Sequence, residues 1–162
     1  MMDNQLWQEL QEYVQLHQSL ILSEMIMSDP VLKQSEMIGL EEYINEKRRP
    51  SLKQILFQYI DEKGFTDAEV YKRAGIDRKH FSKIRSIKDY KPKKTTVIAL
   101  SFALELTVDE AEELLDSGGF SLSESETYDL VVRFFLEREI YSLNKVNEYL
   151  DRFHLKPLGV VQ

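Results

Sequence analysis

The most informative stretch of this chain is residues 66–86, which read TDAEVYKRAGIDRKHFSKIRS. Apolar residues recur at helical spacing in 66–74 and again in 77–86, so the stretch predicts two short helices. Gly75, between them, is expected to supply the left-handed backbone conformation of a tight turn. Ile76 is expected to fill the angle between the helices. A glycine-containing turn between two short helices is typical of a helix-turn-helix unit.

The second of these helices is expected to have two different faces. Phe81 and Ile84 are spaced to hold it against a hydrophobic core, and Asp77 precedes it as an N-cap residue. The opposite face carries Arg78, Lys79, Ser82 and Lys83, with His80 and Arg85 at its flanks. The sequence therefore predicts a helix that presents a strongly basic face to solvent.

The rest of the chain predicts an all-α fold, because apolar residues follow helical spacing and the 162 residues include only 6 glycines and 4 prolines. Three regions are expected: an N-terminal helical arm over 1–50, a five-helix domain over 51–118, and a C-terminal extension over 119–162. In the arm, a long helix is expected before Pro30 and a short one around residues 40–44. The extension is expected to hold two helices, Ser123 to about Arg138 and Leu143 to Phe153.

The distribution of charge changes what the composition implies. A net charge of −7 by itself argues against a nucleic acid partner, because Lys and Arg supply most of the affinity for phosphates. Between Lys72 and Lys94, however, ten basic residues are opposed only by Asp77 and Asp89. This window therefore carries +8 and the rest of the chain −15. A solvated face is one explanation, but clustering of one sign is more typical of an anion-binding surface.

Residues 52–115 resemble the Cro and phage-repressor (XRE-like) type of helix-turn-helix domain, which is a lambda-repressor-like five-helix module. The matching segments, in order, are EKGFT (62–66), GID (75–77), FSKI (81–84) and ALELT (103–107). The tail from Gly118 to Gly159 is similar to a helical extension found on bacterial modules of this kind. The resemblance implies that the fold of the central domain is that of this family.

Four positions depart from the family pattern. Tyr71 stands where a small residue is usual and Ala74 where a larger aliphatic is usual, which should alter how the two helices pack. Asp67 replaces a common glutamine, and Arg85 replaces a common glutamate. These exchanges affect how the second helix would dock on its target, and they leave the expected fold unchanged.

The resemblance implies sequence-specific binding of double-stranded DNA by a bacterial or phage transcriptional regulator, with the second helix in the major groove. By position, the residues that would read bases are Arg78, Lys79, Ser82 and Lys83. Those placed for phosphates are Lys72, His80, Arg85, Lys91, Lys93, Lys94, Thr95 and Thr96. The main alternative is a protein-interaction adaptor or antitoxin-like partner that uses the helix-turn-helix only as a scaffold. RNA binding is a further alternative.

The arm is expected to make protein contacts. Its apolar residues Trp7, Leu10, Val14 and Ile21 recur at helical spacing. This stripe would bind a second copy of the chain or another protein, or it would fold back over the C-terminal extension. The sequence leaves these alternatives open.

Several classes of protein are not expected. The chain has no cysteine, and His17, His80 and His154 lack the spacing of metal ligands, so no metal site is predicted. Phosphate-binding glycine loops and nucleophile motifs do not occur, and neither an enzyme nor a bound cofactor is expected. No apolar run is long enough for a membrane span, and the acidic start does not resemble a signal peptide. A cytoplasmic protein with no membrane contact is predicted.

Overall fold

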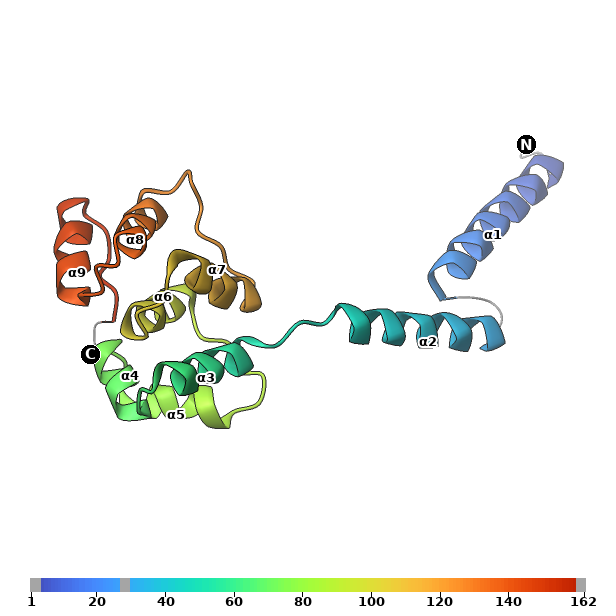
Figure 1. The fold of residues 1–162 in the computed structure, drawn as a ribbon. Coiled ribbons are helices and arrows are strands. Elements are labelled where there is room, and N and C mark those ends of the chain that lie inside the picture. The colour runs from blue at the N-terminus through green and yellow to red at the C-terminus, as the bar shows by residue number, and fades with distance from the viewer. Residues whose placement is uncertain (1–3, 27–29, 160–162) are drawn as a thin grey trace. The chain divides into compact units, whose positions relative to one another are not determined.

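The computed structural model describes the backbone of residues 4–26 and 30–159, and the side chains of residues 4–16 and 34–159. Within these ranges every regular element is a helix (Figure 1), so the predicted all-α class is confirmed. The chain divides into two compact units, Met1–Arg48 and Arg49–Gln162.

The first unit contains helices α1 (Asn4–Ile26) and α2 (Pro30–Lys47). The expected short helix around residues 40–44 is wrong in length, because α2 begins ten residues earlier, at Pro30. Proline is well suited to the first position of a helix, where its fixed φ is already helical and its missing N–H is not needed. All side chains that the structure describes in this unit are exposed.

The second unit begins with five helices over residues 51–118. They are α3 (Leu52–Lys63), α4 (Asp67–Arg73), α5 (Arg78–Ser86), α6 (Lys94–Ala103) and α7 (Val108–Ser117). Ser51 caps α3 by a reciprocal capping box with Gln54, and Gly64 ends the helix with a φ of 75°. Such boundaries depend on residues three or four apart, so the local sequence determines them.

Two further helices, α8 (Thr127–Glu137) and α9 (Leu143–Arg152), complete the unit. The predicted start of α8 at Ser123 is wrong by four residues. The backbone N–H of Ser123 donates to the carboxylate of Asp129 at 2.7 Å, so the chain before Thr127 turns back toward the helix instead of continuing it. The helix predicted over Leu143 to Phe153 is observed as α9 and ends one residue earlier, at Arg152.

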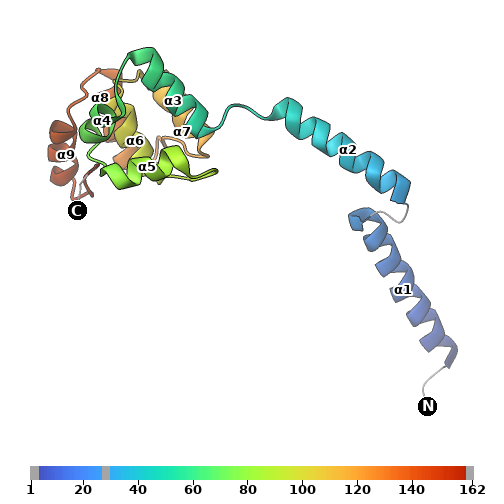
Figure 2. The ribbon, with the colours of Figure 1, turned by 90° about the horizontal axis from the view of Figure 1, so that it is seen from below.

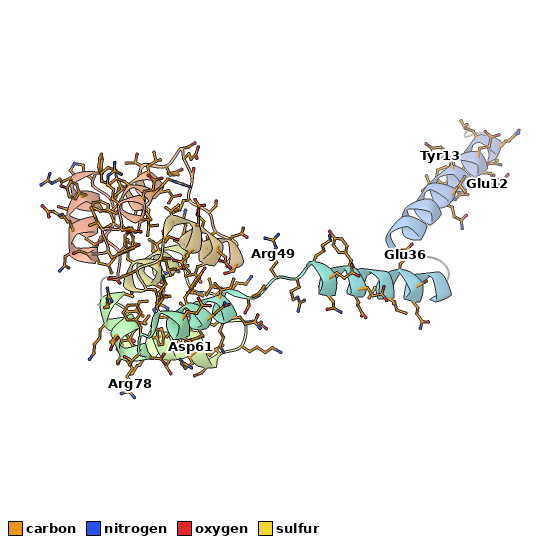
Figure 3. The ribbon with its side chains drawn as sticks, in the orientation of Figure 1. Glu12, Tyr13, Glu36, Arg49, Asp61 and Arg78 are labelled. Carbon is orange, nitrogen blue, oxygen red and sulfur yellow. The ribbon has the colours of Figure 1, made fainter. Side chains whose placement is uncertain are left out.

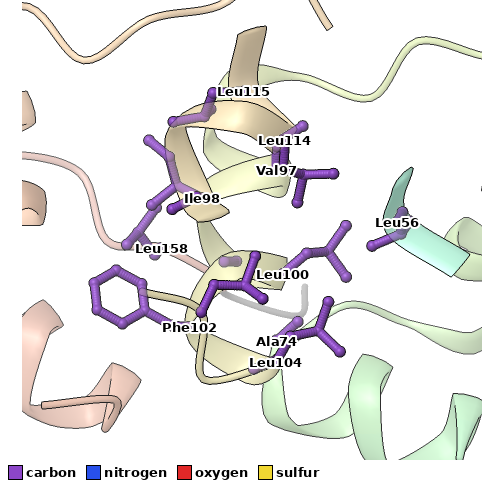
Figure 4. Packing of buried hydrophobic residues seen from close by; sticks show 14 of the residues in the cluster. Leu56, Ala74, Val97, Ile98, Leu100, Phe102, Leu104, Leu114, Leu115 and Leu158 are labelled. Atoms are coloured by element: carbon purple, nitrogen blue, oxygen red, sulfur yellow. The ribbon is translucent and has the colours of Figure 1, made fainter. Parts of the chain in front are cut away.

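The seven helices of the second unit share one hydrophobic core around α6. Every residue from Val97 to Ala103 is buried, and the hydroxyl of Ser101 donates to the carbonyl of Val97 at 2.9 Å. Side chains from α3, α4, α7 and the C-terminal segment converge on this helix (Figure 4). Val132, Leu136, Leu150 and Leu158 belong to the same core. The extension predicted over 119–162 is therefore packed into the same compact unit as the five-helix domain.

Among the helices that the structure describes, we find none with the length and apolar character needed to cross a membrane.

Candidate nucleic-acid interface

The turn between α4 and α5 spans residues 74–77 and sets the direction of α5. Gly75 has a φ of +66°, and Ile76 is buried, as the sequence predicted. The carboxylate of Asp77 accepts the backbone N–H of His80 at 2.8 Å and so caps α5. The start of α5 is therefore held by a local cap and by the buried turn together.

The inner face of α5 packs into the core through Phe81 and Ile84, which are 3% and 1% exposed. The ring of Tyr71 lies 5.8 Å from that of Phe81, while Ala74 is completely buried. The exchange of sizes at positions 71 and 74 is thus accommodated, because the large ring of Tyr71 packs beside Phe81 and the small side chain of Ala74 occupies a fully buried site.

The outer face of α5 brings together the four residues predicted to read bases. Arg78, Lys79, Ser82 and Lys83 are all exposed. Helix α5 lies on the outside of the second unit in both ribbon views (Figures 1 and 2), and Arg78 projects away from the unit (Figure 3). The arrangement therefore presents one basic helix face to solvent.

The basic residues of the 72–94 window fall into two groups. Three of them form ion pairs inside the unit: Arg73 with Glu105 at 2.9 Å, Arg85 with Asp67 at 2.7 Å, and Lys94 with Asp129 at 2.7 Å. The other seven have no ion pair within the part of the chain that the structure describes. They are Lys72, Arg78, Lys79, Lys83, Lys88, Lys91 and Lys93. The unpaired group leaves positive charge available for an external anion.

Arg85, predicted as a phosphate contact, makes contacts within the unit. Its guanidinium group lies 2.7 Å from the Asp67 carboxylate and 4.2 Å from the centre of the Phe57 ring. The two charged departures from the family pattern therefore pair with each other. They join the C-terminal end of α5 to α4 and α3.

Lys94 also has an internal partner. Its Nζ donates to Oδ2 of Asp129, a carboxylate that is 3% exposed and also accepts the Ser123 N–H. A buried carboxylate needs such partners, because an unpaired buried charge is costly. Lys94 thus joins the start of α6 to the start of α8.

Five of the predicted phosphate contacts lie together. A cleft of about 710 Å³ separates the start of α5 from the start of α6. Its lining includes His80, Lys91, Lys93, Thr95 and Thr96. The C-terminal segment adds Lys156, which is not among the predicted contacts and which no local sequence pattern connects to this surface. Lys72 lines a different pocket, beside Arg73 and Glu105.

The residues predicted to make protein contacts in the arm are exposed where their side chains are described. Trp7, Leu10 and Val14 are 46%, 50% and 44% exposed. Ile21 lies outside the residues whose side chains the structure describes. The structure thus presents three of the four residues as exposed side chains on α1.

Within the described residues, no three acidic or histidine side chains are grouped so that they could hold a metal ion. Comparisons with protein-family models, with curated proteins and with solved structures found no match. Evidence about function therefore comes from the geometry and chemistry of α5 and its surroundings.

Proposed function

We propose that this protein binds double-stranded DNA in a sequence-specific manner, as a bacterial or phage transcriptional regulator. The proposal treats α4 and α5 as a helix-turn-helix in a lambda-repressor-like domain. The observation that carries it is the outer face of α5, where Arg78, Lys79 and Lys83 are exposed and form no ion pair with any residue whose side chain the structure describes. Nearby cations such as Arg85 and Lys94 are paired internally.

In this proposal α5 lies in the major groove, which is wide enough to admit a helix. Arg78 and the lysines would contact the acceptor edge of guanine, and Ser82 can donate to or accept from any base. Arginine gives the more specific contact, because its planar group can make two parallel hydrogen bonds. His80, Thr95, Thr96 and the lysines of the cleft would contact the adjacent phosphates, which fix the register of the helix on the duplex.

The test is fluorescence anisotropy with mixed genomic DNA fragments at two salt concentrations. Affinity should fall steeply with salt, because binding releases counterions from the phosphates. Replacing Lys79 and Lys83 together by alanine should weaken binding by about tenfold or more. The control is Lys145→Ala with Arg152→Ala on α9, which removes the same charge away from α5 and should have little effect.

The second candidate function is a protein-interaction adaptor, and the observation that favours it is the exposure of the apolar side chains of Trp7, Leu10 and Val14 on α1. Absence of duplex binding at low salt, or binding that is indifferent to the Lys79 and Lys83 substitutions, would favour this alternative.

Protein contacts made by the N-terminal arm are compatible with either function. Regulators of the proposed class bind two half-sites as dimers, so we propose a second copy as the partner of residues 1–50. Light scattering on the intact protein measures whether a dimer forms.

Bacterial DNA lies in the cytoplasm, so the proposed function implies a cytoplasmic protein.

A further inference from the structure

The C-terminal segment, residues 155–159, lies directly against the turn that precedes α5. A Cβ atom on Gly75 would lie 1.7 Å from the carbonyl oxygen of Gly159, and a Cβ on Gly159 would lie 2.1 Å from that of Ala74. Neither position has room for a side chain. The two backbones are therefore in contact, although they are more than eighty residues apart in the chain.

The segment is held in this place by α9. The side-chain amide of Asn147 donates to the carbonyl of Leu158 at 2.9 Å and accepts the N–H of Leu158 at 2.7 Å. The side chain of Leu158 is completely buried in the core. Two hydrogen bonds and one buried anchor thus fix the position of the segment relative to the turn.

This placement brings Lys156 to the cleft beside the start of α5. Lys156 is exposed and lines the cleft together with Lys91 and Lys93. Within the described residues none of the three lysines forms an ion pair. Asp77 also lines the cleft, but its carboxylate is used to cap α5. The cleft therefore has an excess of positive charge contributed by two distant parts of the chain.

We propose that Lys156 binds a DNA phosphate, so that the C-terminal segment is part of the DNA-binding surface. This inference rests on the proposed function. A helix in the major groove has phosphate backbones on both sides, and the cleft lies immediately beside the start of α5. Asn147 acts through Lys156 as a positioning residue, because it holds the segment that carries the lysine.

The experiment measures duplex affinity of the full chain by anisotropy over a series of salt concentrations. Lys156→Ala should lower affinity about fivefold at 0.15 M salt and make the slope of log K against log salt shallower by about 0.9, the value for one phosphate contact. The matched control is Lys145→Ala, an exposed lysine on α9 with the same change of charge, which should leave the slope unchanged.

Asn147→Ala supplies the second measurement. Without the two hydrogen bonds between Asn147 and Leu158, residues 155–159 should no longer hold Lys156 at the cleft. This variant should therefore show the same shallower slope of log K against log salt. Adding Lys156→Ala to it should cause no further change. A structural effect of Asn147 alone would lower affinity without changing the slope, and circular dichroism checks that each variant is folded.

The outcomes separate the two proposals. If the natural chain binds duplex DNA and Lys156→Ala behaves like Lys145→Ala, the role of Lys156 is refuted while the proposed function stands. If the natural chain does not bind duplex DNA at low salt, both proposals are refuted. A shallower slope for Lys156→Ala alone supports the contact with phosphate.

Discussion

At the scale of single residues, Arg85 shows how a cation in a basic window can have a structural role. It pairs with Asp67 and lies over the Phe57 ring, so its positive charge is partly compensated within the unit. Arg78, seven residues earlier on the same helix, has no such partner among the described residues. The two arginines should therefore respond differently to substitution.

We predict that Arg85→Ala lowers the free energy of unfolding by about 1 kcal/mol, the sum expected for a partly exposed ion pair and a cation–π contact. Arg85→Glu should cost more, because it places a second carboxylate beside Asp67. Arg78→Ala should change stability by less than about 0.5 kcal/mol. Urea denaturation measures all three, and equal stability of Arg85→Ala and Arg78→Ala would show that the Arg85 contacts contribute nothing.

Two glycines provide a matched test of the contact between the turn and the C-terminal segment. Gly64 and Gly75 both have positive φ, at 75° and 66°. A Cβ on Gly64 would meet nothing within 4 Å, whereas one on Gly75 would meet the Gly159 backbone. Alanine should therefore carry the same conformational penalty at both sites and an additional steric penalty at position 75 alone.

We predict that Gly64→Ala destabilises the protein by about 1–2 kcal/mol, the usual cost of a left-handed residue with a side chain. Gly75→Ala should cost clearly more, because backbone atoms cannot move aside as a flexible side chain can. Thermal unfolding followed by circular dichroism compares the two variants. Similar losses of stability at both positions would mean that residues 155–159 impose no steric constraint on the turn.

At the scale of elements, the second unit is held together by capped helix ends and by hydrogen bonds and ion pairs between helices. The hydroxyl of Tyr59 on α3 donates to the Glu113 carboxylate on α7 at 2.7 Å, and Lys63 on α3 pairs with Glu110 on α7 at 3.2 Å. Burial and the hydrogen bond to Glu113 both raise the pKa of Tyr59. These contacts fix α3 against α7, and Phe57 of α3 contacts Phe81 and Arg85 of α5.

Glu110 should make stability depend on pH in the acid range. Burial acts to raise its pKa, but hydrogen bonds from the Thr107 backbone and Lys63 outweigh this and lower the pKa below its ordinary value of 4.5. A carboxyl group with a lowered pKa stabilises the fold above its unfolded pKa, and this contribution is lost as the pH falls through the folded pKa.

We predict that the free energy of unfolding decreases as the pH falls from 5 toward 3, and that Glu110→Gln makes this decrease less steep. Urea denaturation at several pH values measures it. Glu69→Gln, at an exposed acidic residue near the start of α4, is the control. An equally steep decrease in the Glu110→Gln protein would contradict the assignment.

At the scale of the whole molecule, charge is divided unequally along the chain. The 72–94 window carries +8 and the remainder −15. Under the proposed function, the acidic remainder repels DNA from every surface except that near α5. Such repulsion suppresses non-specific binding and favours one orientation of approach.

We predict that Glu41→Gln with Glu42→Gln raises the affinity for non-specific duplex DNA, because it removes two negative charges from the exposed surface of α2. The effect should be largest at low salt, where charges are least screened. Anisotropy with random-sequence duplexes at two salt concentrations measures it. An unchanged affinity would show that the acidic arm does not affect docking.

The sequence alone determined the helical class, the bounds of α5, its cap at Asp77 and its basic outer face. These features depend on residues within one or two helical turns of each other, so the local sequence is sufficient to determine them. Only the tertiary structure decided that Arg85 and Lys94 are paired internally and that Lys156 reaches the cleft. Their partners lie 18, 35 and more than 60 residues away in the chain, and their proximity depends on how the helices pack together.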